Sequence, residues 1–174
     1  MKKYSVFGFI LCLLLSACGS DDSVEQAKEL SVQQFEAAGV ENMENDALFA
    51  AEAASANMLL VQLSEAAINR GVSPEVKSFA QRAENTHIQM SNELQEMASQ
   101  TNLVLPKVLG NDDKKIYDEL LEKEGIAFDI GFIRTMRDQH RLMLKKHEDI
   151  VEHGNSMEVK QYASRQLPLL RQHS

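Results

Sequence analysis

The chain has 174 residues, of which 44% are apolar and 25% are charged, and its formal net charge is −8. This length suits one domain, and the composition is that of a globular protein rather than a disordered one. The acidic balance argues against nucleic-acid binding, which needs a basic face. With 8 glycines and 3 prolines, turns must be few and elements long, which favours an all-helical fold over a β-sandwich or barrel.

Residues 1–17 have the layout of a secretory signal peptide. Lys2 and Lys3 precede an apolar run over residues 6–15, which is too short to span a bilayer. The run leads into Leu-Ser-Ala-Cys-Gly at residues 15–19. This segment resembles the bacterial lipobox, in which the cysteine, here Cys18, becomes lipidated and is the first residue of the mature chain. The alternative is an ordinary signal peptide followed by a coincidental cysteine.

Lipidation at Cys18 has specific consequences. Cys12 is removed with the signal peptide, so the mature chain has no free thiol for catalysis, a disulfide or metal ligation. Loss of Lys2 and Lys3 leaves 16 basic and 26 acidic residues, a formal charge of −10. Several acyl chains give a stable membrane anchor. By resemblance to lipoproteins of enteric-type bacteria, Gly19 implies the periplasmic face of the outer membrane.

Residues 18–45 are expected to be the lipidated N-terminus and a polar tether, and residues 46–174 the folded domain. The segment 19–45 is polar and acidic, which is typical of a tether. Apolar side chains at helical spacing, at Val24, Ala27, Phe35 and Ala38, indicate a short amphipathic helix as the alternative.

The predicted domain contains an internal repeat. Residues 73–82, SPEVKSFAQR, match residues 156–165, SMEVKQYASR. At the same spacing, Phe49 matches Phe132 and Gly71 matches Gly154, and we call residues related in this way equivalent positions. Each copy has the pattern of a helix, a turn with glycine, a serine N-cap and a second helix. We expect both glycines to end the preceding helix with a positive φ.

This repeat predicts helices at about 46–70, 73–100, 127–153 and 156–172, with a short surface helix over residues 112–123. One helical hairpin cannot bury its apolar face alone, whereas two hairpins together make a four-helix bundle. The long connection between the second and third long helices resembles the topology of ferritin-like bundles.

Four of the five histidines fall on the apolar stripes of these helices. His87 follows Ser73, at one hairpin turn, by as many residues as His140 precedes Gly154, at the other. At about 1.5 Å per residue, both should lie near the middle of the bundle. His173 is expected within about one turn of the same level, and His147, two turns from His140, at a second level.

The histidines at the middle level are candidate metal ligands. Glu84 and His87 have the Glu-x-x-His spacing of di-metal carboxylate bundles, but the other carboxylates of such a site are missing. We therefore consider a single Zn, Cu or Fe ion held by His87, His140 and His173, with Glu84 as a fourth ligand. The alternative is a buried network in which neutral histidines and Asn57 fix the helix register.

Short motifs through the domain are shared with one known family. They are Asp46-x-x-Phe49, Pro74-Glu75-Val76-Lys77-x-Phe79-Ala80, His87 with Asn92-Glu93-Leu94, Leu105-Pro106, Phe128-Asp129, Met136 with His140, and Leu167-Pro168-x-Leu170-x-x-His173. On these motifs, residues 46–173 resemble the DUF4142 proteins of bacterial envelopes. The resemblance implies a ferritin-like fold and no settled function.

This chain also departs from the family pattern. The family usually has an aspartate directly before each inner histidine, where this chain has Thr86 and Gln139, and Leu60 stands where the family has a glutamate. These departures weaken a metal site that depends on those acids.

We expect a non-enzymatic lipoprotein, held at the membrane by its N-terminal lipid, that acts through its surface in envelope stress tolerance or by binding a protein partner. The alternative is a metal-binding or metal-buffering bundle built on the histidine cluster. A di-metal oxidase or peroxidase ranks last, for lack of carboxylates. We expect no nucleic-acid partner.

Overall fold

The computed structural model describes residues 21–173, apart from the side chain of His173. These residues form six helices and no strand: α1 (Ser23–Ala37), α2 (Glu44–Arg70), α3 (Pro74–Ser99), α4 (Asn111–Leu121), α5 (Gly125–His153) and α6 (Met157–His173). The all-helical prediction is confirmed, and the predicted boundaries of the four long helices and of α4 agree within two residues. The predicted signal peptide and Cys18 lie outside the described residues.

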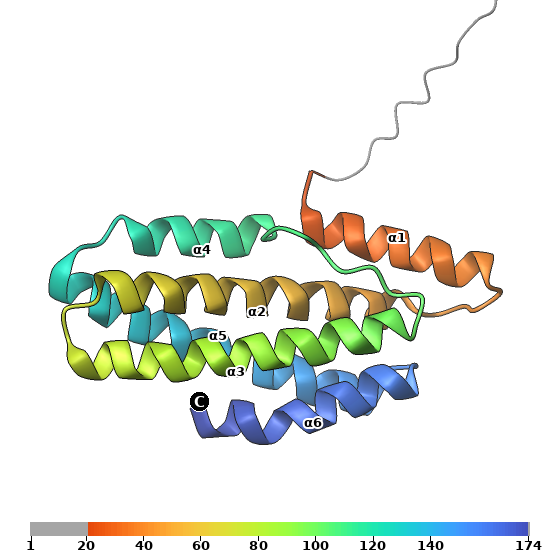
Figure 1. Ribbon diagram of the computed structural model, residues 1–174. Helices are drawn as coiled ribbons and strands as arrows, with labels where there is room; N and C mark the ends of the chain where they lie inside the picture. The colour runs from red at the N-terminus through yellow and green to blue at the C-terminus, as the bar shows by residue number, and fades with distance from the viewer. Residues whose placement is uncertain (1–20, 174) are drawn as a thin grey trace, which may run out of the picture.

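The four long helices contact one another in a ring. Helix α2 packs on α3, α3 on α6, α6 on α5, and α5 on α2. Helices α1 and α4 both pack along the outside of α2, nearly end to end (Figure 1). Helix α2 is long and apolar enough to cross a membrane, but 61% of its most apolar window is buried inside the fold. This burial is expected of a helix at the centre of a domain.

One face of α2 is buried along the length of the helix. Its members are all at most 5% exposed: Phe49, Ala53, Asn57, Leu60, Ser64 and Ala67. Their spacing of three or four residues places them along one face of the helix. Two polar side chains, Asn57 and Ser64, are thus held inside the core.

The sequence repeat is reproduced as a pseudo-two-fold arrangement of aromatic rings. Phe49 of α2 meets Tyr162 of α6 with ring centroids 6.4 Å apart and an interplanar angle of 62°. At the equivalent positions, Phe132 of α5 meets Phe79 of α3 at 6.0 Å and 63°. Each pair joins the first helix of one hairpin to the second helix of the other, with the edge-to-face geometry that aromatic rings prefer.

Two buried carboxylates join the hairpins in the same reciprocal way. Asp46, near the start of α2, accepts hydrogen bonds from the backbone amides of Asn155 and Ser156, both at 2.9 Å. Its counterpart Asp129, in α5, accepts from the amide of Ser73 at 2.8 Å and from that of the preceding residue at 3.2 Å. Each carboxylate therefore caps the turn of the opposite hairpin. We call this pair of contacts the aspartate clasp.

The turn glycines lie at the predicted positions, but the predicted conformation is wrong. Gly71 has φ −55° and Gly154 has φ −65°, so neither is left-handed. A Cβ at Gly71 would lie 2.6 Å from the carbonyl oxygen of Ala67, and one at Gly154 would lie 2.7 Å from that of Ile150. Glycine is needed here because there is no space for a Cβ atom.

Helix α1 corrects the expectation of a polar tether over residues 18–45. Asp22 caps α1 through the amide of Val24 at 2.8 Å, and Phe35 is 6% exposed in a core cluster with residues of α2. The hydroxyl of Ser31 accepts from the amide of Val104 in the α3–α4 connection at 2.8 Å. Residues 23–37 therefore form the helix named as the alternative, and they pack as part of the folded domain, which that alternative did not include.

Candidate functional site

His87 of α3 and His140 of α5 meet in the core. Their Nε2 atoms are 3.1 Å apart and their ring centroids 5.1 Å apart. The side chains are 0% and 2% exposed. The helix rise predicts that both histidines lie at the same level of the bundle. This prediction is confirmed, because the two rings meet although the residues are 53 positions apart in the chain.

The partners of the outer nitrogens indicate one proton arrangement of this pair. His140 Nδ1 lies 2.6 Å from the carbonyl oxygen of Met136, and His87 Nδ1 lies 2.8 Å from Oδ1 of Asn57. Both oxygens only accept, so both Nδ1 atoms carry the hydrogen. In two neutral rings, both Nε2 atoms would then present lone pairs to each other. With the amide of Asn57 as placed, this geometry calls for a shared cation between the rings, either a proton or a metal ion.

A second hydrogen-bonded state of the pair needs no cation. As placed, Nδ2 of Asn57 is buried without a hydrogen-bond partner. If the amide is turned over, Nδ2 donates to Nδ1 of His87, and His87 Nε2–H donates to Nε2 of His140. Both rings are then neutral, and the three side chains form the buried polar network named above as the alternative.

The other predicted ligands do not complete a metal site among the described residues. Glu84 is half-buried, and its carboxylate accepts from the amide of Gln81 at 2.8 Å. Helix α6 continues through Pro168 to His173, whose side chain lies outside the described residues. Within the described part of the chain, no group of three or more His, Cys, Asp or Glu side chains could hold a metal ion.

His147 lies further along α5, at a second level as expected. It is 1% exposed, with its ring centroid 4.9 Å from that of Phe49 and 6.0 Å from that of Tyr162. Its Nδ1 donates to the carbonyl oxygen of Met143 at 2.7 Å, whereas its Nε2 has no partner. Burial lowers the pKa of His147 to about 4, against the smaller opposing effect of that hydrogen bond. The ring is therefore neutral at pH 7, with an unused acceptor.

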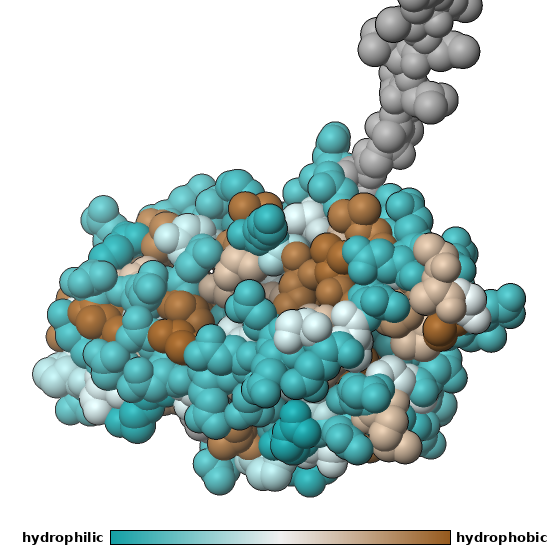
Figure 2. Space-filling view, turned by 45° about the vertical axis from the view of Figure 1, so that its right-hand side comes forward, coloured by the Kyte–Doolittle hydropathy of each residue, from teal (hydrophilic) through white to brown (hydrophobic). Residues whose placement is uncertain are grey.

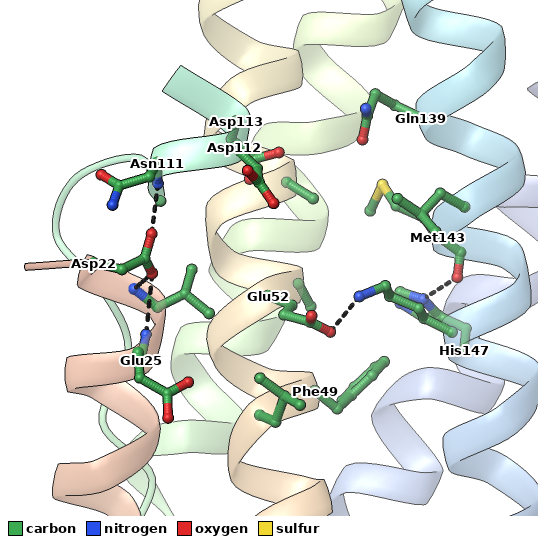
Figure 3. Close-up of a pocket in the computed structure, with 17 residues that line it drawn as sticks. Asp22, Glu25, Phe49, Glu52, Asn111, Asp112, Asp113, Gln139, Met143 and His147 are labelled. Atoms are coloured by element: carbon green, nitrogen blue, oxygen red, sulfur yellow. Dashed lines mark hydrogen bonds and ion pairs between the residues drawn. The ribbon is translucent and has the colours of Figure 1, made fainter. Parts of the chain in front are cut away.

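A pocket of about 360 Å³ adjoins His147. It lies between α2 and α5, and the starts of α1 and α4 close one side of it (Figure 3). Asp113 of α4 accepts a hydrogen bond from Ser55 at 2.5 Å, and burial raises the pKa of Asp113 more than this bond lowers it. Glu52 and Lys146 form an ion pair at 2.5 Å across the pocket. We call this feature the α2–α5 pocket.

Sequence reasoning did not find the α2–α5 pocket. Its walls come from four helices, and two of these, α1 and α4, lie outside the repeat. Asp113 belongs to a segment expected to be a short surface helix. No motif links Asp113 to His147, so only the packing of α4 on α2 brings them to one pocket.

The structure defines the class of protein as an all-helical domain with an internal duplication and a buried histidine pair. Comparison with known families then places it. The chain belongs to the DUF4142 family, a domain of unknown function, whose sequence model matches residues 31–174. The match confirms the resemblance and begins within α1, ahead of the boundary expected at residue 46.

One similar solved structure is the crystal structure of "putative secreted protein DUF305 from Streptomyces coelicolor". The two share 17% identity with a TM-score of 0.59, over 74% of this chain and 86% of that one. At this identity the similarity shows the fold alone. A comparison with curated proteins gives no match.

Proposed function

We propose that this protein is a non-enzymatic metal-binding lipoprotein of the bacterial envelope, with its metal site built on His87 and His140. The observation that supports this function is the pair of Nε2 atoms facing each other at 3.1 Å, while both Nδ1 atoms face oxygens that only accept. A metal ion bound by both Nε2 lone pairs would satisfy this arrangement while each Nδ1 keeps its hydrogen for its oxygen acceptor.

The distances fit such an ion. Two metal–nitrogen bonds of about 2.05 Å that meet at roughly 100° place their nitrogens about 3.1 Å apart. The Nδ1 bonds to Asn57 and Met136 fix the ring orientations, as outer partners do for metal-bound histidines. Imidazole suits Zn, Cu or Fe.

The fold and the N-terminus are part of the same proposal. We interpret the ring of α2, α3, α5 and α6 as a ferritin-like four-helix bundle, an architecture that builds metal sites from side chains on facing helices. The lipobox-like segment supports lipid attachment at Cys18 and a place on the periplasmic face of the outer membrane. The fold similarity to a protein described as secreted also favours an extracytoplasmic location.

Metal analysis of the full-length chain, expressed without a histidine tag, tests the site. We expect stoichiometric Zn, Cu or Fe that is lost in the His87→Ala/His140→Ala double variant. His153→Ala is the matched control, because this histidine is exposed and pairs with Asp149 at the end of α5. Metal retained by the double variant would show that the ligands are elsewhere. Wild-type protein without metal, combined with loss of stability in the double variant, would identify the neutral network with Asn57.

Action through the surface, in stress tolerance or with a protein partner, is the second candidate. It is favoured by an exposed apolar stripe at helical spacing on α5, formed by Ile126, Ile130 and Ile133, which are 70%, 57% and 42% exposed. Exposed apolar stripes of this kind are typical of interaction surfaces. An envelope-stress phenotype that persists in the metal-free double variant and disappears in Ile130→Glu would favour this candidate over metal binding.

A further inference from the structure

We infer that the α2–α5 pocket binds a small organic cation, an alkylamine or guanidine with an aliphatic body. Its N–H groups would donate to Asp113 and His147, and its aliphatic part would lie on the apolar walls. The site is separate from the His87–His140 pair and does not depend on metal binding there.

His147 supplies the first argument. Its side chain is 1% exposed and lines the pocket. Its Nδ1 hydrogen is engaged by the carbonyl oxygen of Met143, so its Nε2 can only accept, and it has no partner. A buried acceptor left without a donor costs about 1–3 kcal/mol. A ligand whose N–H group reaches this Nε2 removes that cost, whereas a ligand that only accepts does not.

The charge of the lining supplies the second argument. Lys146 is the single lysine or arginine among the residues that line the pocket. Five acidic side chains line it as well: Asp22, Glu25, Glu52, Asp112 and Asp113. Lys146 is engaged by Glu52, and its attraction lowers the pKa of Asp113 less than burial raises it. The pKa of Asp113 is raised overall, with burial as the largest cause, which means that Ser55 and Lys146 compensate its ionised form only in part. A cation bound in the pocket would supply the remaining compensation for the negative charge of Asp113.

The walls and the size of the pocket define the rest of the ligand. Apolar side chains form the walls between the polar groups: Val24, Leu48, Phe49, Ala53, Ala56, Leu142 and Met143. Figure 2 shows an apolar area, surrounded by hydrophilic side chains, just below the point where the described chain begins. A volume of about 360 Å³ lies at the small end of ligand pockets. Aliphatic walls of this extent match a chain of several methylene groups rather than a bare metal ion.

The geometry of the polar groups agrees with this choice. Asp113 enters from α4 and His147 from α5, on different sides of the cavity (Figure 3). They do not belong to any described group of three or more side chains close enough to hold a metal ion. An ammonium or guanidinium group carries several donors and can reach more than one acceptor.

Titration calorimetry of the full-length protein with pentylamine tests the proposal, with 1-pentanol and pentanoate as probes of equal length. We expect saturable binding of pentylamine, binding of pentanol weaker by about tenfold or more, and no binding of pentanoate. Asp113→Asn should weaken the amine by about tenfold or more, because it removes the charge and keeps an acceptor for Ser55. Asp118→Asn, on the exposed side of the same helix, is the matched control and should bind as the wild type does.

His147→Phe tests the second acceptor, because phenylalanine keeps a ring between Phe49 and Tyr162 and lacks Nε2. We expect a loss comparable to that of Asp113→Asn, and a shift of the His147 Nε2 ¹⁵N resonance when pentylamine is added to the wild type. If circular dichroism shows that this variant does not fold, the comparison of Asp113→Asn with the wild type and the resonance shift test the proposal instead. Absence of amine binding, equal binding of pentanol, or unchanged binding by Asp113→Asn would each overturn the proposal. Amine binding that persists in His87→Ala/His140→Ala separates it from the metal site.

Discussion

Replacing Asp46 by alanine should remove half of the aspartate clasp. The carboxylate is 0% exposed and accepts two backbone hydrogen bonds at 2.9 Å, from Asn155 and Ser156. A hydrogen bond to a charged group contributes about 1.5–3 kcal/mol. Because the capped turn is only partly buried, water can replace some of the loss, and the lower figure applies to each bond. We therefore expect Asp46→Ala to lower the free energy of unfolding by about 3 kcal/mol.

Urea denaturation followed by circular dichroism measures this change, and thermal unfolding should show a Tm lower by about 6–12 °C. Asp129→Ala should behave alike, because its carboxylate makes the same contacts with the other turn. Asp138→Ala is the control, since Asp138 is exposed and its partner is the adjacent Arg137. If either clasp variant differs from this control by less than about 0.5 kcal/mol, which is typical of surface changes, the reciprocal clasp does not stabilise the fold.

Three further outcomes follow from the same contacts. Gly154→Ala should destabilise by about 1–3 kcal/mol in urea, because a Cβ there meets the carbonyl oxygen of Ile150 at 2.7 Å. The pKa of His147 is about 4 in the folded chain. As the pH falls from 6.5 toward 4, His147 therefore takes up a proton in the unfolded chain but stays neutral in the folded chain. Stability should therefore fall by about 3 kcal/mol over this window, and urea unfolding at several pH values should show a shallower fall in His147→Leu. A bound metal at His87 and His140 should raise stability by about 2.7 kcal/mol at a free concentration of 100 times its Kd, an effect that a chelator reverses in thermal unfolding.

The helices and their inward faces could be predicted because both follow from spacing along one chain. A helix has a fixed rise, so two histidines at equal sequence distances from their hairpin turns share a common level. For this reason, the meeting of His87 with His140 could be predicted from the sequence. The positions of the two glycine turns could be predicted for the same reason. Their conformation could not, because it depends on the close approach of the carbonyl group four residues earlier in the chain.

Two other kinds of contact between helices, those of the aspartate clasp and those of Asp113, could not be predicted in this way. The repeat makes Asp46 and Asp129 equivalent positions, but a carboxylate near a helix start is an ordinary surface feature until the opposite turn is placed against it. Likewise, Asp113 lies on a short, polar helix, and its partner Ser55 lies 58 residues away. Both features depend on how helices pack, which periodicity alone does not fix.

The internal duplication distinguishes the residues that stabilise the fold from the residues of the two proposed binding sites. The capping carboxylates, turn glycines, serine N-caps and edge-to-face ring pairs recur at both copies, because both hairpin ends need the same hydrogen bonds, space and packing. At the buried polar positions of the core, the residue type differs between the copies. At equivalent positions of the repeat, His140 corresponds to Asn57 and His147 to Ser64. The two proposed sites thus lie where the copies differ.

Restoring the symmetry at these positions gives a last prediction. The double variant His140→Asn/His147→Ser places in α5 the side chains that α2 already buries at the equivalent positions. The clasp and the ring pairs are unchanged, so we expect the variant to keep its helical circular dichroism and a cooperative unfolding transition, with a loss of stability from the smaller side chains. It should bind neither the metal nor pentylamine. A symmetrised chain that folds and still binds both ligands would show that the histidines of α5 serve only to fill the core.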